Sequence, residues 1–192
     1  MVIVPELDWS RMAGLCGILA PVVNLSAVFL AILLSPWFSW SANALSDLGV
    51  AEAALLFNTG LMLGGILTVV LAAGLFSKFK GQTTRRAGAL LLFLAAVELF
   101  GVGVFSEAAG IIHFYFSVAF FMLLPIALLV IGAGAIAAKS RKFGAFTIIL
   151  GILAGLPWAF SWSAEAVPEM LSALAVSAWC IAQGAILYFG KT

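Results

Sequence analysis

Two polar side chains at the ends of long apolar segments have the types needed for proton transfer. His113 is the single histidine of the chain, and a neutral imidazole can take a proton from a hydroxyl or a water near neutral pH. Asp47 carries a carboxylate that could orient this base. Together they would serve a membrane-embedded lipid hydrolase or transferase with His113 as general base, which is one alternative for this protein. The alternative is that His113 contacts lipid headgroups or ends a helix, without any chemistry.

A zinc site is the second chemistry that a histidine raises. Three histidines hold the zinc of membrane amidohydrolases, and a chain with one histidine cannot build that site. A mixed site with Asp47, Glu107 or Glu165 stays open, although no ligand-spacing motif supports it. We predict that the protein holds no metal and no cofactor.

The acids near His113 point instead to a pocket for a ligand. We expect the mouth of this pocket to be lined by Asp47, His113, Asn43, Ser46, Glu107 and Glu165. Ser117 comes one helical turn after His113 and shares its face. No Lys or Arg accompanies these acids, so the pocket favours a cationic or polyhydroxyl ligand over a bare phosphate. For Ser46 and Asp47 the alternative role is to cap the second apolar segment, with Gly49 permitting a tight turn.

Glu98 lies within an apolar segment, where an ionisable residue is costly and is a functional candidate. It precedes Phe105 by seven residues, which puts it roughly 10 Å below that end of the helix. We expect it to form the deep acid of the pocket or to carry protons in a proton-coupled transporter. The alternative is a neutral Glu98 that hydrogen-bonds to Asn58 or Ser117.

A seven-residue motif occurs twice in the chain. Residues 38–44 read Phe-Ser-Trp-Ser-Ala-Asn-Ala, and residues 160–166 read Phe-Ser-Trp-Ser-Ala-Glu-Ala. Both copies follow apolar segments that run in the same direction, so they predict a parallel internal pseudo-repeat. We expect the matched Trp40 and Trp162 to form aromatic walls of the pocket. An aromatic belt at the membrane surface is the alternative.

The elements that must position these residues are transmembrane helices. The chain is 65% hydrophobic and 9% charged, whereas soluble domains carry about 25% charged residues. Six segments reach the roughly 20 apolar residues of a membrane span: 10–35, 54–77, 84–105, 111–138, 143–162 and 169–189. We therefore predict a single all-α integral membrane domain over residues 1–192, a six-transmembrane-helix bundle of three helical hairpins. The acidic N-terminus does not fit a cleaved signal peptide, so the first span is expected to be retained.

The connections between these segments alternate in charge. Basic residues occupy the connections after the second and fourth segments and flank the first and last segments: Lys78, Lys80, Arg85, Arg86, Lys139, Arg141, Lys142, Arg11 and Lys191. The other three connections carry acids and no Lys or Arg. By the positive-inside rule we predict a multi-pass protein of the cell membrane with both termini cytoplasmic. Membrane lipids are the expected partners, nucleic acid is not, and a homo-oligomer stays open.

Residues 45–49, Leu-Ser-Asp-Leu-Gly, follow the first apolar segment. Here the chain resembles the prokaryotic six-span family named domain of unknown function 998. That family is similar to the damage-regulated autophagy modulators and to glycolipid-remodelling membrane proteins.

In those families a Ser-Asp-x-Gly motif follows the first span, and a histidine opens the span after the second outer loop. Ser46, Asp47, Gly49 and His113 stand at those places. The family often has Phe-Pro with a nearby Asp at the end of the third span, where this chain has Phe-Ser-Glu-Ala at 105–108. The resemblance implies a six-span membrane protein with a lean toward lipid-linked work.

These observations lead to one expected function and two alternatives. We predict a membrane protein with an outward-facing polar pocket that binds a lipid headgroup or a small polar molecule. The alternatives are the hydrolase or transferase that uses His113 and Asp47, and the transporter that uses Glu98. In the half expected to face the cytoplasm, Thr147 and Gln183 are nearly the only polar residues within the spans. A one-sided pocket is therefore favoured over a path through the membrane.

Overall fold

The computed structural model describes residues 8–190. Within this part of the chain there are six long α-helices, three short 3₁₀ helices and no strand. Each long helix, the fifth together with the 3₁₀ turn that follows it, is long and apolar enough to cross a membrane. The predicted all-α architecture with six membrane-spanning helices is confirmed. The long helices are α1 (Trp9–Leu33), α2 (Ala54–Lys78), α3 (Thr83–Val104), α4 (Ile111–Ala137), α5 (Arg141–Gly155) and α6 (Ala166–Phe189).

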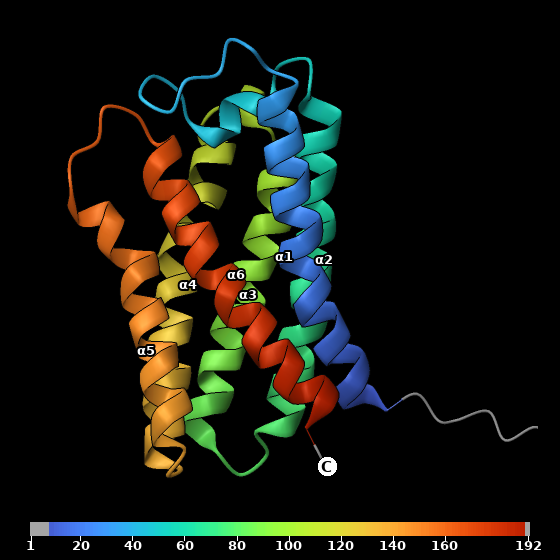
Figure 1. The fold of residues 1–192 in the computed structure, drawn as a ribbon, viewed down its shortest axis with the longest axis vertical. Coiled ribbons are helices and arrows are strands. Elements are labelled where there is room, and N and C mark those ends of the chain that lie inside the picture. Colours follow the sequence, from blue (N-terminus) through green and yellow to red (C-terminus); the bar gives the residue numbers. More distant parts are fainter. Residues whose placement is uncertain (1–7, 191–192) are drawn as a thin grey trace, which may run out of the picture.

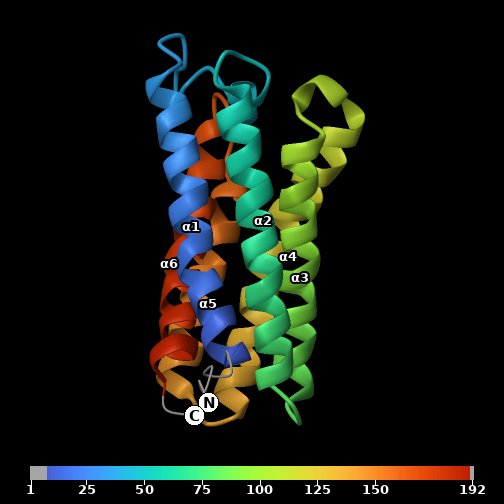
Figure 2. The same cartoon turned by 90° about the vertical axis from the view of Figure 1, so that its right-hand side faces the viewer.

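The helices form a ring. Consecutive helices run in opposite directions and lie side by side, and α6 returns to pack against α1 (Figures 1 and 2). Across the ring, α4 and α6 touch at only a few places. Side chains fill the middle of this ring, but the filling is incomplete between α4 and α6.

The acid-bearing connections lie together at one end of the bundle, which we call the acidic end (Figures 1 and 2). They are residues 34–53, 105–110 and 160–165, and they include η1 (Leu45–Gly49) and η2 (Glu107–Ala109). The other two connections, with their basic residues, lie at the opposite or basic end, as do the first and last described residues. Lys191, counted among the basic flanks, lies outside the described residues. Which end faces the cytoplasm stays a prediction from the charges.

Glycines allow the closest helix crossings. A Cβ at Gly184 of α6 would lie 2.6 Å from the carbonyl oxygen of Gly14 in α1. Gly132 of α4 and Gly144 of α5 face each other in the same way, because a Cβ on either would lie 2.9 Å from the carbonyl oxygen of the other. Small residues let helices associate in lipid, where no hydrophobic effect draws them together. These crossings close the ring at α1 and α6 and hold α5 against α4.

The fifth helix is the shortest of the six. α5 stops at Gly155, and the chain continues through η3 (Leu156–Ala159). Pro157 in this turn lacks a backbone N–H and cannot continue the helix. Residues 160–165 then loop away from the bundle and return to begin α6 (Figure 1). The helical part of the expected span 143–162 therefore ends at residue 159.

Candidate functional site

A groove opens at the acidic end between α4 and the start of α6, beside the end of α5. Its volume is about 750 Å³, which is within the range of small-molecule sites. The residues that line it come from the first connection, η2, α4, the end of α5 with η3, and the start of α6: Ala44, Ser46, Glu107, Gly110, His113, Phe114, Ser117, Val118, Phe121, Met122, Pro125, Ile126, Gly155, Trp158, Glu165 and Glu169.

The lining changes from charged to apolar along the groove. Glu107, Glu165 and Glu169 provide carboxylates at the acidic end. His113 and Ser117 come next along α4, and below them lies an apolar wall: Val118, Phe121, Met122, Pro125 and Ile126. At 1.5 Å per residue, Ser117 lies about 9 Å and Ile126 about 22 Å below the start of α4. The groove therefore extends over a depth comparable to one leaflet of a bilayer, whose hydrocarbon part is about 15 Å thick.

His113 is buried beside the groove, above this wall, and both of its ring nitrogens have partners. Nδ1 lies 2.8 Å from the carbonyl oxygen of Phe105, the residue that caps the end of α3. Because a carbonyl only accepts hydrogen bonds, Nδ1 carries the proton. In the neutral ring Nε2 is then the acceptor, and it receives the hydroxyl of Ser117 at 3.2 Å.

Gly110 begins α4 beside this histidine. Its φ of +59° is in the left-handed region, where a residue with a Cβ is strained. The glycine therefore lets the short η2 connect directly to α4. This sharp entry puts His113 within reach of the Phe105 carbonyl at the end of α3.

Asp47 does not orient His113, so that expected pairing is wrong. Asp47 Oδ2 accepts hydrogen bonds from the side-chain amide of Asn43 at 2.7 Å and from the backbone N–H of Ala44 at 3.2 Å. The carboxylate braces η1, and the Phe105 carbonyl takes its expected place beside the histidine. Nor does Asp47 or Ser46 cap the second helix, because α2 begins without a side-chain cap.

Asn43 joins the first connection to the start of α6. Its backbone carbonyl accepts from the N–H of Ala166 at 3.1 Å, and its Oδ1 accepts from the N–H of Ser39 at 2.9 Å. Neither Asn43 nor Asp47 lines the groove. Both support its rim from behind.

Gly49 is close to α2 and does not form the expected tight turn. Its φ is not positive. A Cβ there would lie 2.7 Å from Oδ1 of Asn58, whose side-chain amide donates to the Gly49 carbonyl at 2.9 Å. The glycine therefore permits a close approach that attaches η1 to α2.

Carboxyl groups from three elements meet at the mouth of the groove. The carboxyl of Glu107 is hydrogen-bonded to that of Asp47 and faces the charge of Glu165. Burial, the hydrogen bond with Asp47 and the charges of Asp47 and Glu165 raise the pKa of Glu107 to about 7. Glu169 is buried behind them, and its Oε2 accepts a 2.6 Å hydrogen bond from the backbone N–H of Leu45. Glu107 therefore keeps its proton to a higher pH than an ordinary glutamic acid does.

A comparison with known protein families identifies the family of this chain. The family model described as "Protein of unknown function (DUF998)" matches residues 18–186. The chain belongs to this family. No curated protein and no solved structure matches it. In this DUF998 protein, all the residues that line the groove lie within the matched segment.

Glu98 lies apart from the groove of the DUF998 protein. It is half-buried on α3 and lines neither the groove nor the central cavity described below. The partners expected for it bond elsewhere: Asn58 to Gly49, and Ser117 to His113. α3 is rotated so that Ala96, Leu99 and Val102 face the middle of the bundle. The expectation that Glu98 is the deep acid of the pocket is therefore wrong.

The matched tryptophans do not line the groove either. Trp40 is partly exposed and packs edge-on against Phe38. Trp162 donates from its indole nitrogen to the Pro157 carbonyl at 2.7 Å. Their expected role as walls is wrong for this groove, because neither side chain is among its lining residues and Trp162 lines a separate hollow between α5 and α6. The internal pseudo-repeat stays a prediction.

Trp158, which the sequence interpretation did not select, forms the aromatic wall. It lines the groove with its ring centroid 4.7 Å from that of Phe121. Its indole nitrogen donates to the Ser172 hydroxyl at 3.0 Å. The sequence signal that could have identified Trp158 was its position directly after Pro157, where the helix had to end.

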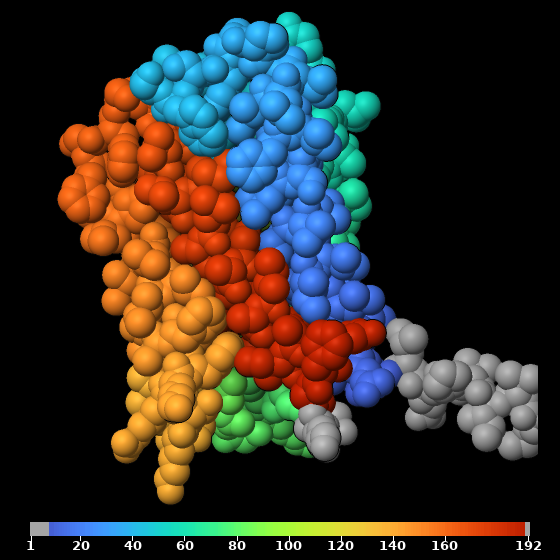
Figure 3. All heavy atoms as spheres, viewed as in Figure 1, coloured from blue at the N-terminus to red at the C-terminus, as the bar shows by residue number. Residues whose placement is uncertain are grey.

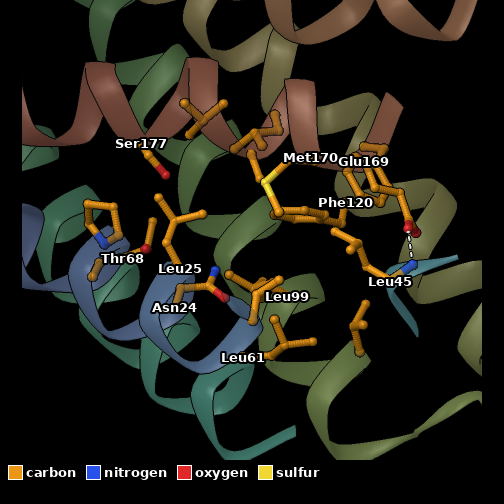
Figure 4. A pocket seen from close by; sticks show the side chains of 18 of the residues that line it. Asn24, Leu25, Leu45, Leu61, Thr68, Leu99, Phe120, Glu169, Met170 and Ser177 are labelled. Atoms are coloured by element: carbon orange, nitrogen blue, oxygen red, sulfur yellow. Dashed lines mark hydrogen bonds between the residues drawn. The ribbon is translucent and has the colours of Figure 1, made fainter. Parts of the chain in front are cut away.

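A central cavity of about 100 Å³ lies next to the groove, in the middle of the ring (Figure 4). The two spaces share Ser46, Ser117, Phe121 and Glu169 as lining residues. Its walls are mostly apolar, and its deeper polar groups are Asn24, Thr68 and Ser177. The Asn24 Oδ1 atom is buried without a hydrogen-bond partner.

The described residues offer no metal site. Between residues 8 and 190, no group of three His, Cys, Asp or Glu side chains is arranged to hold a metal ion. What the groove presents is a bonded histidine–serine pair between carboxylates and an apolar wall. That arrangement can bind an amphiphile and can transfer a proton to and from a hydroxyl.

Proposed function

We propose that this DUF998 protein binds a membrane lipid in the groove, with the headgroup among the carboxylates and an acyl chain along α4. The observation that carries the proposal is the change of the lining from charged to apolar along α4. A lipid in a leaflet changes from polar to apolar over a similar depth. A small polar molecule would fill only the charged part and would leave the apolar wall uncovered.

The charges favour a headgroup with an amine. Three acidic side chains line the groove, and among residues 8–190 the connections of the acidic end contain no Lys or Arg. An ammonium group would donate charge-assisted hydrogen bonds to the oxygens of these side chains. A bare phosphate would find no cation there. Phosphatidylethanolamine has this headgroup chemistry.

The apolar wall suits entry of a lipid from the side. Phe114, Met122 and Ile126 line the groove and are 55%, 60% and 42% exposed. On a helix that crosses a membrane, such side chains face hydrocarbon. An acyl chain lying against them would exchange contacts with the bilayer for contacts with the protein, without crossing water.

The distribution of basic residues favours an orientation with the acidic end outward. Lys and Arg gather at the other end of the bundle, and short basic connections stay on the cytoplasmic side. The protein would then lie in the cell membrane with both termini cytoplasmic, and the bound lipid would come from the outer leaflet.

The proton-coupled transporter receives no support from the position of Glu98. This residue lines neither internal space, so a proton on it has no cavity through which to move. We therefore do not propose transport.

Native mass spectrometry of the detergent-extracted protein tests lipid binding. Gly155→Leu is the test variant, because a Cβ there meets Pro125 at an ordinary 3.4 Å and a longer side chain would extend into the groove. Ala178→Leu is the matched control. Ala178 is exposed and lines a separate apolar hollow between α5 and α6 that has no carboxylate.

We expect the wild type and Ala178→Leu to retain phosphatidylethanolamine at one copy per chain. Gly155→Leu should retain about tenfold less, equivalent to about 1.4 kcal/mol of binding free energy. Equal retention in all three proteins would contradict the proposal.

A further inference from the structure

We infer that Ser117 and His113 form a nucleophile–base pair that transfers the acyl group of a lipid ester bound in the groove. The inference rests on the proposed function, because the bound lipid must bring its ester beside Ser117. Three observations carry it: the bonds of His113, the unusual partner of Ser117, and the depth of both in the groove.

His113 is arranged as a general base. The Phe105 carbonyl, 2.8 Å away, keeps the proton on Nδ1 and leaves Nε2 to accept from Ser117 at 3.2 Å. A hydroxyl, a base within hydrogen-bond reach and a third group that orients the base are the parts of an activated nucleophile. Here the third group is a backbone carbonyl, which selects the tautomer without adding a charge.

Ser117 differs from other hydroxyls on these helices. Thr68, Ser77 and Thr147 donate to the backbone carbonyl four residues earlier, at 2.8 Å, 3.1 Å and 2.8 Å. That bond is the ordinary one for a hydroxyl on a helix. Ser117 is instead paired with an imidazole. A backbone carbonyl would have been enough to accept a hydrogen bond from the Ser117 hydroxyl, so hydrogen bonding alone does not require a histidine here.

Both residues lie where the groove passes from polar to apolar. Ser117 is about 9 Å below the start of α4, between the carboxylates and the wall that contains Phe121. In a glycerolipid the ester carbonyls lie between the headgroup and the chains. A lipid with its amine among the carboxylates and a chain along Phe121 would therefore place an ester next to Ser117.

The reaction follows from this geometry. Ser117 Oγ attacks the ester carbonyl carbon while its proton passes to His113 Nε2. The bond between that carbon and the glycerol oxygen breaks, and the departing alcohol takes the proton from Nε2. The acyl group is then an ester of Ser117. A water that gives its proton to Nε2 attacks the acyl carbon, and the proton returns to Ser117 Oγ as the fatty acid leaves. Lipid and water are the only reactants in this balance.

Ser46 is suited to help the carbonyl oxygen accept charge. Among the described residues it is the other hydroxyl that lines both the groove and the central cavity. It comes from η1, so it approaches from an element other than α4. A donor directed at the developing oxyanion is a large contribution to acyl transfer.

A long-chain alkyl fluorophosphonate tests the pair, because it phosphonylates activated serines and releases fluoride. The full chain is reconstituted in nanodiscs that contain phosphatidylethanolamine, and the labelled peptide is identified by mass spectrometry. We expect labelling at Ser117, none in Ser117→Ala, and a rate about 10²-fold lower in His113→Ala. Ser177→Ala is the control, since Ser177 lines the central cavity but is not paired with His113, and its labelling should equal that of the wild type.

A wild type that does not react, although it retains phosphatidylethanolamine in native mass spectra, would overturn the inference and leave the proposed function intact. Labelling at another serine, or equal rates in wild type and His113→Ala, would also overturn it. Labelling of Ser117 in a protein that retains no lipid would support the pair and contradict lipid binding. Thermal unfolding of each variant verifies that it is folded.

Discussion

Glu169 and Leu45 are joined by a 2.6 Å hydrogen bond from the backbone N–H of Leu45 to the Glu169 carboxylate, although 124 residues separate them. The bond attaches η1 to the first turn of α6 (Figure 4). Glu169 lines both the groove and the central cavity. The wall between the two spaces therefore depends on this contact.

Replacing Glu169 should show how much this bond stabilises the fold. Glu169→Ala leaves the buried N–H of Leu45 without an acceptor, which should lower the free energy of unfolding by about 1–3 kcal/mol. Glu169→Gln keeps an acceptor in a side chain of the same length, so it should lose much less. Thermal unfolding in detergent measures both. Equal losses would show that the hydrogen bond does not matter to stability.

The raised pKa of Glu107 predicts that the stability of the folded protein falls as pH rises. Its pKa is about 7 in the folded protein against an ordinary 4.5, because burial, the hydrogen bond with Asp47 and the charge of Glu165 favour the neutral form. Between these values the folded protein holds a proton that the unfolded chain has lost. The stabilisation is therefore full below the ordinary pKa and is lost as pH rises through about 7.

Thermal unfolding between about pH 5 and pH 8 checks this expectation, because that interval contains most of the Glu107 titration. The midpoint should fall with pH in the wild type and fall less in Glu107→Gln. Glu52→Gln is the control. Glu52 lies at the same end, but its own backbone N–H and the indole of Trp37 lower its pKa, so this variant should keep the wild-type slope. Parallel curves for wild type and Glu107→Gln would rule out the role given to Glu107.

The crossing of α1 and α6 should not tolerate a methyl group. A Cβ at Gly184 would lie 2.6 Å from the Gly14 carbonyl oxygen, so Gly184→Ala should cost about 1–3 kcal/mol through overpacking. Gly155→Ala is the matched control, since its Cβ would make an ordinary 3.4 Å contact. That change should be neutral or slightly stabilising. The measurement is the thermal unfolding midpoint of each variant in the same detergent. Equal midpoints for Gly184→Ala and Gly155→Ala would count against the close crossing.

Cysteine labelling checks the proposed orientation in the membrane. In a background with Cys16 and Cys180 replaced by serine, Ser41→Cys introduces a thiol at the acidic end and Lys139→Cys one at the basic end. Both positions are exposed. A membrane-impermeant maleimide should label Ser41→Cys in intact cells and Lys139→Cys only after permeabilisation. The reverse pattern would invert the topology.

The sequence was sufficient to predict the helices, because a long apolar segment with polar connections has few other structures open to it. It was also sufficient to bring His113 and Ser117 together, since residues four apart share a helix face. It could not predict which acid faces the interior. Glu98 lies within one apolar segment and Glu169 begins another, but a helix that is apolar all round has no polar stripe to fix its rotation. Packing against neighbouring helices turns Glu169 inward and leaves Glu98 half-buried.

Contacts between connections were the other part that the sequence could not supply. Asp47 and His113 lie at the same end of the bundle, yet the Asp47 carboxylate is bonded to Asn43 and Ala44, just before η1, and not to the imidazole. The partner of His113 is a backbone carbonyl, which every residue carries and which no motif marks. The repeated motif directed attention to Trp162, whereas the end of α5 at Gly155 made Trp158 the wall.

The proposed entry of a lipid from the side has a consequence for how occupancy of the groove is controlled. For a ligand that enters from within the bilayer, the concentration that governs binding is its mole fraction among the membrane lipids, not its amount per litre of water. Diluting a suspension of membranes should then leave the groove as full as before, while changing the mole fraction of one lipid species should empty or fill it. The protein would in that case respond to the lipid composition of the surrounding membrane and not to the volume of water outside it.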